Sequence, residues 1–173
     1  VELFFKTPEE LESRVGFLRS HGVSSFNLVN KDKRDDMSGW VDAIKTTYPE
    51  ADVCAHYSLK YNKVPRKGIE EQKELLLGFL ENSSANEILL ISGSGEKKAW
   101  NTVEALKAVR DATSTEGDGA SSSHPRIAVA YNPYFPSPSD QKEENRRLTE
   151  KLATGSVSKI YLQFGTDLER LFE

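Results

Sequence analysis

Short apolar runs recur at six places along the chain and alternate with longer stretches of helical periodicity. The runs are rich in Val, Ile, Leu, Phe and Tyr and cover residues 1–5, 25–30, 52–57, 87–92, 126–131 and 159–164. Runs of this length and composition predict β-strands. Because helical segments separate them, the sequence predicts consecutive βαβ units and therefore an α/β fold with a parallel sheet.

The helical segments carry recognisable start and stop signals. In the first, Thr7 is placed to cap the N-terminus, Pro8 suits the first helical position, Glu10 completes a capping box and Gly22 follows the end. Further helices are predicted over residues 36–47, 65–82, 99–112 and 140–153, and a sixth begins near residue 166.

For two of these helices, the sequence predicts which face is buried and which is exposed. The helix over residues 65–82 is expected to bury four apolar side chains, Leu75, Leu76, Phe79 and Leu80. The helix over residues 140–153 is mostly charged, so we expect a wide solvated face on which Glu143 and Arg147 form an i,i+4 ion pair.

Two architectures suit six consecutive βα units: an open doubly wound sheet, and a TIM-type (β/α)8 barrel of which six units are visible. Central strands of an open sheet are covered on both faces and read as continuous apolar runs. Here polar residues interrupt strands with a period of two, as Glu2, Asn27 and Gln163 do. A barrel accommodates them because its strands open into a polar mouth at their C-terminal ends. The pattern favours a partial TIM-type barrel.

The composition fits one soluble domain and disfavours two classes of partner. A chain of 173 residues with 37% hydrophobic content can bury one core, so we expect a single domain over residues 1–173. Its 23 basic residues are dispersed among 27 acidic ones, which leaves no basic stripe for nucleic acid. No apolar run reaches the roughly 18 residues of a membrane span. Residues 113–125, rich in Ser, Gly and Thr, predict a flexible surface loop.

The cysteine, the histidines and the chain ends add three expectations. Cys54 is a single cysteine and has no partner for an internal disulfide, which indicates the cytoplasm or another reducing compartment. The three histidines show no ligand spacing, so no transition-metal site is predicted. The chain starts at Val1 without Met and stops at Glu173 within a helical pattern. We therefore expect a further C-terminal segment, or a second chain in an oligomer, to cover the open barrel edges.

Four strand motifs, in order, resemble those of the methylenetetrahydrofolate reductase family, which are flavin-containing TIM barrels. Residues 1–5 look like the family's first strand, which carries an acid, and residues 53–58 are similar to its third strand, built around His-Leu-Thr-Cys. Residues 127–133 resemble the fifth strand, and residues 161–167 resemble the sixth, with its glutamine and aromatic residues. The resemblance spans nearly the whole chain and implies a TIM barrel, an FAD cofactor and a folate or pterin-type substrate.

The resemblance also assigns roles to particular positions. The acid that matches Glu2 supplies a proton to the pterin nitrogen, His56 matches a residue beside the flavin, and Gln163 would orient the substrate. Other positions depart from the family's pattern. Ser94 stands where the family has the acid of Arg-Gly-Asp near the flavin, and Asn132 begins an Asn-Pro-Tyr stretch in place of Tyr-Pro-Glu.

The helix that follows the fifth strand carries further flavin-contacting positions in the family. Its Asp, Asn, Arg and Lys align here with Glu144, Arg147, Glu150 and Lys151, so one position is retained, one is conservative and two are changed. Lost contacts worth very roughly 1–3 kcal/mol each weaken binding by orders of magnitude. The sequence therefore predicts that FAD binds weakly or not at all.

The candidate residues also have ordinary structural explanations. Glu2 is expected to face the barrel interior, where a carboxylate is costly unless it is paired or functional, or else to fray into water. His56 is either a residue of the site or a rim histidine with satisfied ring nitrogens. Gln163 suits either a polar heterocycle or a polar layer of the barrel. The Ser-Gly-Ser-Gly loop at residues 92–95 offers backbone N–H groups of the kind that bind phosphate, and is otherwise a common βα loop.

Two functions stay open on the sequence alone. The first is a flavin- and folate-dependent oxidoreductase acting on a pterin-type substrate, which Glu2 and Gln163 favour. The second is a non-catalytic barrel that binds a small molecule or a protein partner. The altered positions favour it: Ser94, Asn132, Pro136, Arg147 and Glu150.

Overall fold

Strands and helices alternate strictly along the chain in the computed structural model, which describes residues 1–62, 68–92, 100–113 and 124–172. The strands are β1 (Glu2–Leu3), β2 (Ser25–Leu28), β3 (Asp52–Ser58), β4 (Glu87–Ile91), β5 (Arg126–Tyr131) and β6 (Lys159–Leu162). The helices are α1 (Pro8–Ser20), α2 (Met37–Thr47), α3 (Ile69–Asn82), α4 (Thr102–Thr113), α5 (Pro138–Leu152) and α6 (Leu168–Phe172). The predicted alternation is confirmed. Most of the loop predicted over residues 113–125 lies outside the described residues.

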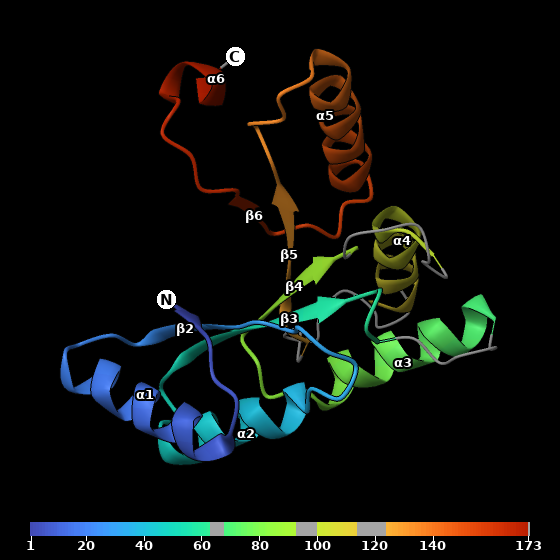
Figure 1. Ribbon diagram of the computed structural model, residues 1–173. Coiled ribbons are helices and arrows are strands. Elements are labelled where there is room, and N and C mark those ends of the chain that lie inside the picture. The colour runs from blue at the N-terminus through green and yellow to red at the C-terminus, as the bar shows by residue number, and fades with distance from the viewer. Residues whose placement is uncertain (63–67, 93–99, 114–123, 173) are drawn as a thin grey trace.

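The six strands form one parallel sheet whose spatial order is the chain order, β1 to β6. Parallel strands joined in sequence by right-handed crossovers place the connecting helices on one side of the sheet. The sheet curls through 197° and forms a half-barrel, which confirms the barrel-type α/β architecture over the doubly wound alternative. Figure 1 shows α1 to α5 around the outer side of the sheet, while its inner side faces the region between β1 and β6.

The start of α1 follows the predicted capping signals with one difference. The Thr7 side chain accepts a hydrogen bond from the backbone N–H of Glu10 at 3.3 Å. The Glu10 carboxylate reaches back to the backbone N–H of Lys6 at 2.9 Å, one residue before the position of a standard capping box. Gly22 follows the helix with a φ of 81°, a conformation that L side chains rarely adopt. These contacts fix the direction in which the chain leaves β1 and returns to β2.

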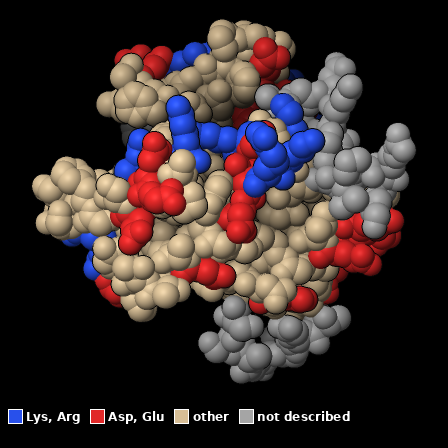
Figure 2. Space-filling view, turned by 60° about the horizontal axis from the view of Figure 1, so that its bottom comes forward, with Lys and Arg blue, Asp and Glu red and all other residues tan. Residues whose placement is uncertain are grey.

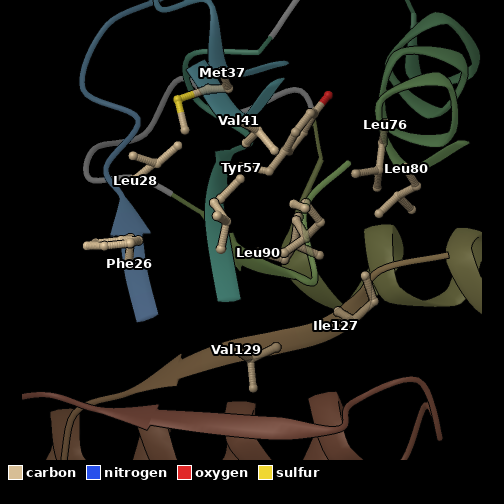
Figure 3. Packing of buried hydrophobic residues seen from close by; sticks show 14 of the residues in the cluster. Phe26, Leu28, Met37, Val41, Tyr57, Leu76, Leu80, Leu90, Ile127 and Val129 are labelled. Atoms are coloured by element: carbon tan, nitrogen blue, oxygen red, sulfur yellow. The ribbon is translucent and has the colours of Figure 1, made fainter. Parts of the chain in front are cut away.

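The main hydrophobic core lies between the outer face of the sheet and the helices. Figure 3 shows side chains from β2, β3, β4 and β5 meeting those of α2 and α3: Phe26, Leu28, Tyr57, Leu90, Ile127 and Val129 with Met37, Val41, Leu76 and Leu80. The face of α3 differs from the prediction. Its buried stripe is Gln72, Leu76 and Leu80, whereas Leu75 is exposed because it lies about a quarter-turn of helix away from Leu76.

A second, smaller apolar cluster lies on the inner face of the sheet. Cys54, Leu89 and Ala128 form it, one from each of β3, β4 and β5. Their neighbours along each strand belong to the outer core, because successive side chains in a strand point to opposite faces. Within the described ranges, no helix is long and apolar enough to cross a membrane.

Candidate functional site

One level of the sheet places five side chains in a row across its inner face. The strand register pairs Glu2 with Asn27 and Asn27 with Cys54. It continues by pairing Cys54 with Glu87 and Glu87 with Arg126. The residues adjacent to these along each strand contribute to the outer core, so the five share the inner face. The row therefore brings a sequence-predicted acid, Glu2, onto the same surface as polar residues that the motifs did not indicate.

Glu87 is the most buried charged residue of this row, with only 2% of its surface exposed. Its Oε1 accepts a hydrogen bond from the Tyr161 hydroxyl at 2.6 Å and another from Lys159 Nζ at 3.1 Å. Its Oε2 is also buried but has no hydrogen-bond partner among the described residues. Arg126 Nε lies 3.7 Å from that oxygen, beyond hydrogen-bond distance. Oε1 thus accepts two hydrogen bonds, whereas Oε2 has an ion-pair neighbour but no hydrogen bond within the described part of the chain.

The groups next to Glu87 stay protonated at neutral pH. Burial raises the pKa of the Cys54 thiol to about 12; the hydrogen bond with Tyr161 opposes this rise and the negative charge of Glu87 adds to it. Burial and the hydrogen bond to Glu87 likewise raise the pKa of the Tyr161 phenol. Cys54 is therefore a packed thiol rather than a nucleophile, since the thiolate is the reactive form. Beside the Glu87 carboxylate, the inner face therefore presents a neutral thiol and a neutral phenol.

His56 lies two residues beyond Cys54 on β3 and shares its face of the sheet. It is only 6% exposed, and its Nε2 has no hydrogen-bond partner within the described part of the chain. Burial lowers its pKa to about 4, so the imidazole is uncharged at neutral pH. The fully buried hydroxyl of Ser58, two residues further along, also lacks a partner among the described residues. Whether His56 is a residue of the site or a satisfied core or rim histidine stays a prediction.

Glu2 and Gln163 occupy opposite edges of the sheet. Glu2 is exposed, and the expectation of a poorly solvated carboxyl is wrong, because only β2 pairs with β1 and solvent reaches this edge. Gln163 directly follows β6, where its backbone N–H donates to the Tyr131 carbonyl at 2.8 Å. Its side chain is exposed. The structure does not bring these two predicted residues into contact within the described chain.

Three other predicted residues come together at β5 and α5. The backbone N–H of Asn132 donates to Glu144 Oε1 at 3.4 Å, and Lys151 Nζ donates to the Ala130 carbonyl at 3.0 Å. Burial lowers the pKa of the Lys151 ammonium, an effect that the charge of Glu144 opposes. These contacts occupy the side chains of Glu144 and Lys151. Ser94 lies outside the described residues.

A surface groove of about 640 Å³ runs between α4 and α5. Three positions that align with flavin contacts line it, Arg147, Glu150 and Lys151. Glu143 also lines it and forms hydrogen-bonded ion pairs with Arg147 at 2.9 Å and with Arg146 at 2.8 Å, which confirms the predicted i,i+4 pair. Arg146 also pairs with Glu150. Opposite charges are intermixed in this groove, as Figure 2 shows for one whole face of the molecule.

The motifs in the sequence did not point to Glu87, Lys159 or Arg126. Glu87 opens the strand Glu-Ile-Leu-Leu-Ile, where a single acid precedes four apolar residues. This isolated acid could have indicated a site, because a carboxylate within a buried strand is costly unless it has a partner. On β6, Lys159 and Tyr161 alternate with apolar residues. Two polar residues on one face of a strand could have indicated the partners of Glu87.

Comparisons with known proteins add no family assignment. No protein-family model matches the chain, and a search of curated proteins finds no match. Across the described residues, no group of three or more His, Cys, Asp or Glu side chains is arranged to hold a metal ion.

Proposed function

We propose that this chain binds a pterin- or folate-type small molecule on the inner face of its half-barrel, as a divergent relative of the methylenetetrahydrofolate reductase family without the family's flavin site. The observation that carries this proposal is the pair His56 and Ser58, two buried polar side chains on one face of β3 whose Nε2 and hydroxyl have no hydrogen-bond partner among the described residues. A buried polar group left unpaired costs about 1–3 kcal/mol. A ligand that hydrogen-bonds to both removes that cost on binding.

The chemistry of the inner face suits an uncharged polar heterocycle. The neutral imidazole of His56 can donate or accept one hydrogen bond at Nε2, according to its tautomer, and the Ser58 hydroxyl can do both. Polar heterocycles present alternating N–H donors and ring-nitrogen or carbonyl acceptors along one edge. Small-molecule sites commonly combine an apolar lining with a few such groups, and Leu89 and Ala128 supply apolar surface beside them.

The residues at the positions aligned with flavin contacts do not fit FAD. The α4–α5 groove presents three carboxylates, Glu104, Glu143 and Glu150, among five basic side chains, Lys107, Arg110, Arg146, Arg147 and Lys151. The arginines of α5 that line it are already paired with two of these acids. The anionic pyrophosphate of the cofactor would have to compete with these carboxylates for the two arginines, which disfavours its binding there.

A folate-using oxidoreductase is the second candidate function. It is favoured by Glu2 and Gln163, which match the acid and the glutamine of the family's first and sixth strands. In this case Glu2 would be the proton donor and Gln163 would orient the substrate. The exposed carboxyl of Glu2 is a weak feature of this candidate, because burial is the usual means of keeping a carboxyl protonated near neutral pH.

Calorimetric titration with 6-methylpterin and with folinic acid tests the main proposal. We expect saturable binding of both, and we expect His56→Leu, which keeps much of the side-chain volume, to weaken it by about 5- to 150-fold, the equivalent of one lost buried hydrogen bond. His21→Leu is the matched control, since His21 is exposed on the outer side at the end of α1. The proposal fails if neither compound binds or if the two variants have the same effect.

A visible absorption spectrum and a turnover assay separate the two candidates. Under the main proposal, the purified protein is colourless and takes up no stoichiometric FAD. Flavin bands at one equivalent, together with folate reduction that Glu2→Gln abolishes while binding persists, would instead favour the oxidoreductase.

A further inference from the structure

Glu87 Oε2 is a buried acceptor on the inner face that has no hydrogen bond among the described residues. Glu87 Oε2 is buried and unpartnered among the described residues, while Oε1 of the same carboxylate has two donors. A carboxylate oxygen accepts up to two hydrogen bonds and cannot donate when ionised. The group that completes this site must therefore offer a donor, such as N–H or O–H.

The charges around Glu87 restrict the donor further. Lys159 and Arg126 lie beside Glu87, and Arg126 also lies beside Asp52, so two positive and two negative charges balance in this cluster. Both cations are about half exposed, whereas Glu87 is buried. Because these charges balance, a cationic ligand would meet no net attraction here. An uncharged donor group, attached to a part of the molecule that carries negative charge, matches both the buried acceptor and the exposed cations.

Arg126 lies near this oxygen but forms no hydrogen bond with it. Its Nε lies 3.7 Å from Glu87 Oε2 and its Nη2 lies 3.6 Å from Asp52 Oδ1, both too long for hydrogen bonds. Arg126 and Asp52 are both about half exposed, and an exposed ion pair of this kind contributes about 0–1 kcal/mol. Oε2 therefore has a hydrogen-bonding position that Arg126 does not fill.

Glu87 is also close to the other unpartnered groups. The register pairs His56 with Leu89, which is two residues beyond Glu87 on β4. His56 and Glu87 are therefore diagonal neighbours on one face, with Cα atoms roughly 8 Å apart from the standard strand spacing and rise. A bicyclic heterocycle spans such a distance, so one ring can reach both residues.

We propose that Glu87 orients the ligand: its Oε2 accepts a hydrogen bond from the amino or ring N–H edge of an uncharged heterocycle whose acidic tail lies near Lys159 and Arg126. This inference rests on the proposed pterin- or folate-type function and names the residue that selects the ring. It predicts that the 2-amino group of a pterin is recognised directly, because that group lies beside a ring N–H and forms a donor edge with it.

A comparison of two ring analogues on the unaltered protein tests the ring contact. 6-Methyllumazine carries a carbonyl oxygen in place of the 2-amino group of 6-methylpterin, so it would set an acceptor against Glu87 Oε2. We expect at least about 10-fold weaker binding of the lumazine by calorimetry, the size expected for a hydrogen bond to a charged group. This arm does not depend on the folding of any variant.

Variants then test whether the preference for the pterin depends on Glu87 and whether Lys159 contacts the acidic tail. Glu87→Gln should remove the preference for the pterin, while Glu12→Gln, an exposed acid on α1, should leave it unchanged. Lys159→Gln should weaken the binding of folinic acid, which has an acidic tail, more than the binding of 6-methylpterin, which has none. Equal binding of pterin and lumazine would overturn the role of Glu87 and leave the proposed function standing, whereas no binding of either pterin or folinic acid would defeat both.

Discussion

Tyr161 on β6 donates a 2.6 Å hydrogen bond to Glu87 on β4, reaching over the intervening strand β5. Strand β5 makes this contact feasible because it presents only small side chains there: the register places Ala130 beside Tyr161 and Ala128 beside Lys159. The longer side chains of β6 therefore lie over β5 and reach the carboxylate. The hydrogen bond therefore links β6 to the buried Glu87 on β4.

Removing the Tyr161 hydroxyl should destabilise the fold measurably. Hydrogen bonds to charged groups contribute about 1.5–3 kcal/mol, so we expect Tyr161→Phe to lower the free energy of unfolding by that amount in urea titrations. The matched control is Tyr131→Phe, which removes a hydroxyl donating to Asn145 at the exposed surface. We expect the control to lose less than about 1 kcal/mol. Equal losses in the two variants would show that the contact with Glu87 adds nothing beyond an ordinary surface hydrogen bond.

The fold was largely predictable because its signals are local. The apolar runs and the caps of α1 are read from neighbouring residues, and six strands in alternation with helices lead directly to a parallel sheet. The boundaries shifted where local signals compete, as in α3, where the structure describes the helix from Ile69 rather than residue 65. The choice of a half-barrel rested on Glu2, Asn27 and Gln163, polar residues alternating with apolar ones, and that interpretation is confirmed.

The candidate site was less predictable because it depends on strand register. No local pattern states that Cys54 lies opposite Glu87, or that a lysine and a tyrosine 72 and 74 residues later reach its carboxylate. The family resemblance directed attention to the chain ends, at Glu2 and Gln163, which the structure places on separate edges of the sheet. It also indicated His56, whose burial and free Nε2 could be recognised only once the inner face was known.

Lys151 should stabilise the fold as a donor to the backbone rather than as a surface charge. The ladder between β4 and β5 ends at the pair Leu90 and Val129, and Lys151 Nζ donates to the next carbonyl, that of Ala130. We expect Lys151→Met to lower the free energy of unfolding by about 1 kcal/mol, because that carbonyl loses its donor. Lys142→Met, at an exposed position of the same helix, is the control and should change little. Indistinguishable unfolding curves for the two variants would contradict this role.

The β6 edge should promote association of the isolated chain. Ile160 and Leu162 are 37% and 51% exposed, and the far side of this strand has no neighbour in the described sheet. Exposed apolar strand edges pair with other chains. We expect sedimentation velocity to show concentration-dependent association that Leu162→Lys reduces. Ile69→Lys, at a similarly exposed apolar residue on α3, should leave association unchanged. A monomer over the whole concentration range would contradict the prediction.

His56 should make the stability of the fold fall as the solution becomes acidic. Burial lowers its folded-state pKa to about 4, whereas an unfolded histidine has a pKa of about 6.5. Between these values the unfolded chain binds a proton at His56 that the folded chain does not, so acid favours unfolding. The contribution is fully present above pH 6.5 and is lost as the pH falls toward 4, at up to about 1.4 kcal/mol per pH unit.

Urea titrations at pH 7 and pH 4.5 measure this effect. Over that interval we expect the unaltered protein to lose about 2–3 kcal/mol more stability than His56→Gln, which cannot titrate, because the carboxylates of both proteins respond alike. His21→Gln, at an exposed histidine, should follow the unaltered protein closely. If His56→Gln shows the same acid sensitivity as the unaltered protein, the imidazole is not held in a desolvated, uncharged state. The inner face would then present a hydrated histidine, and the argument that a ligand completes its hydrogen bonding would lose its main support.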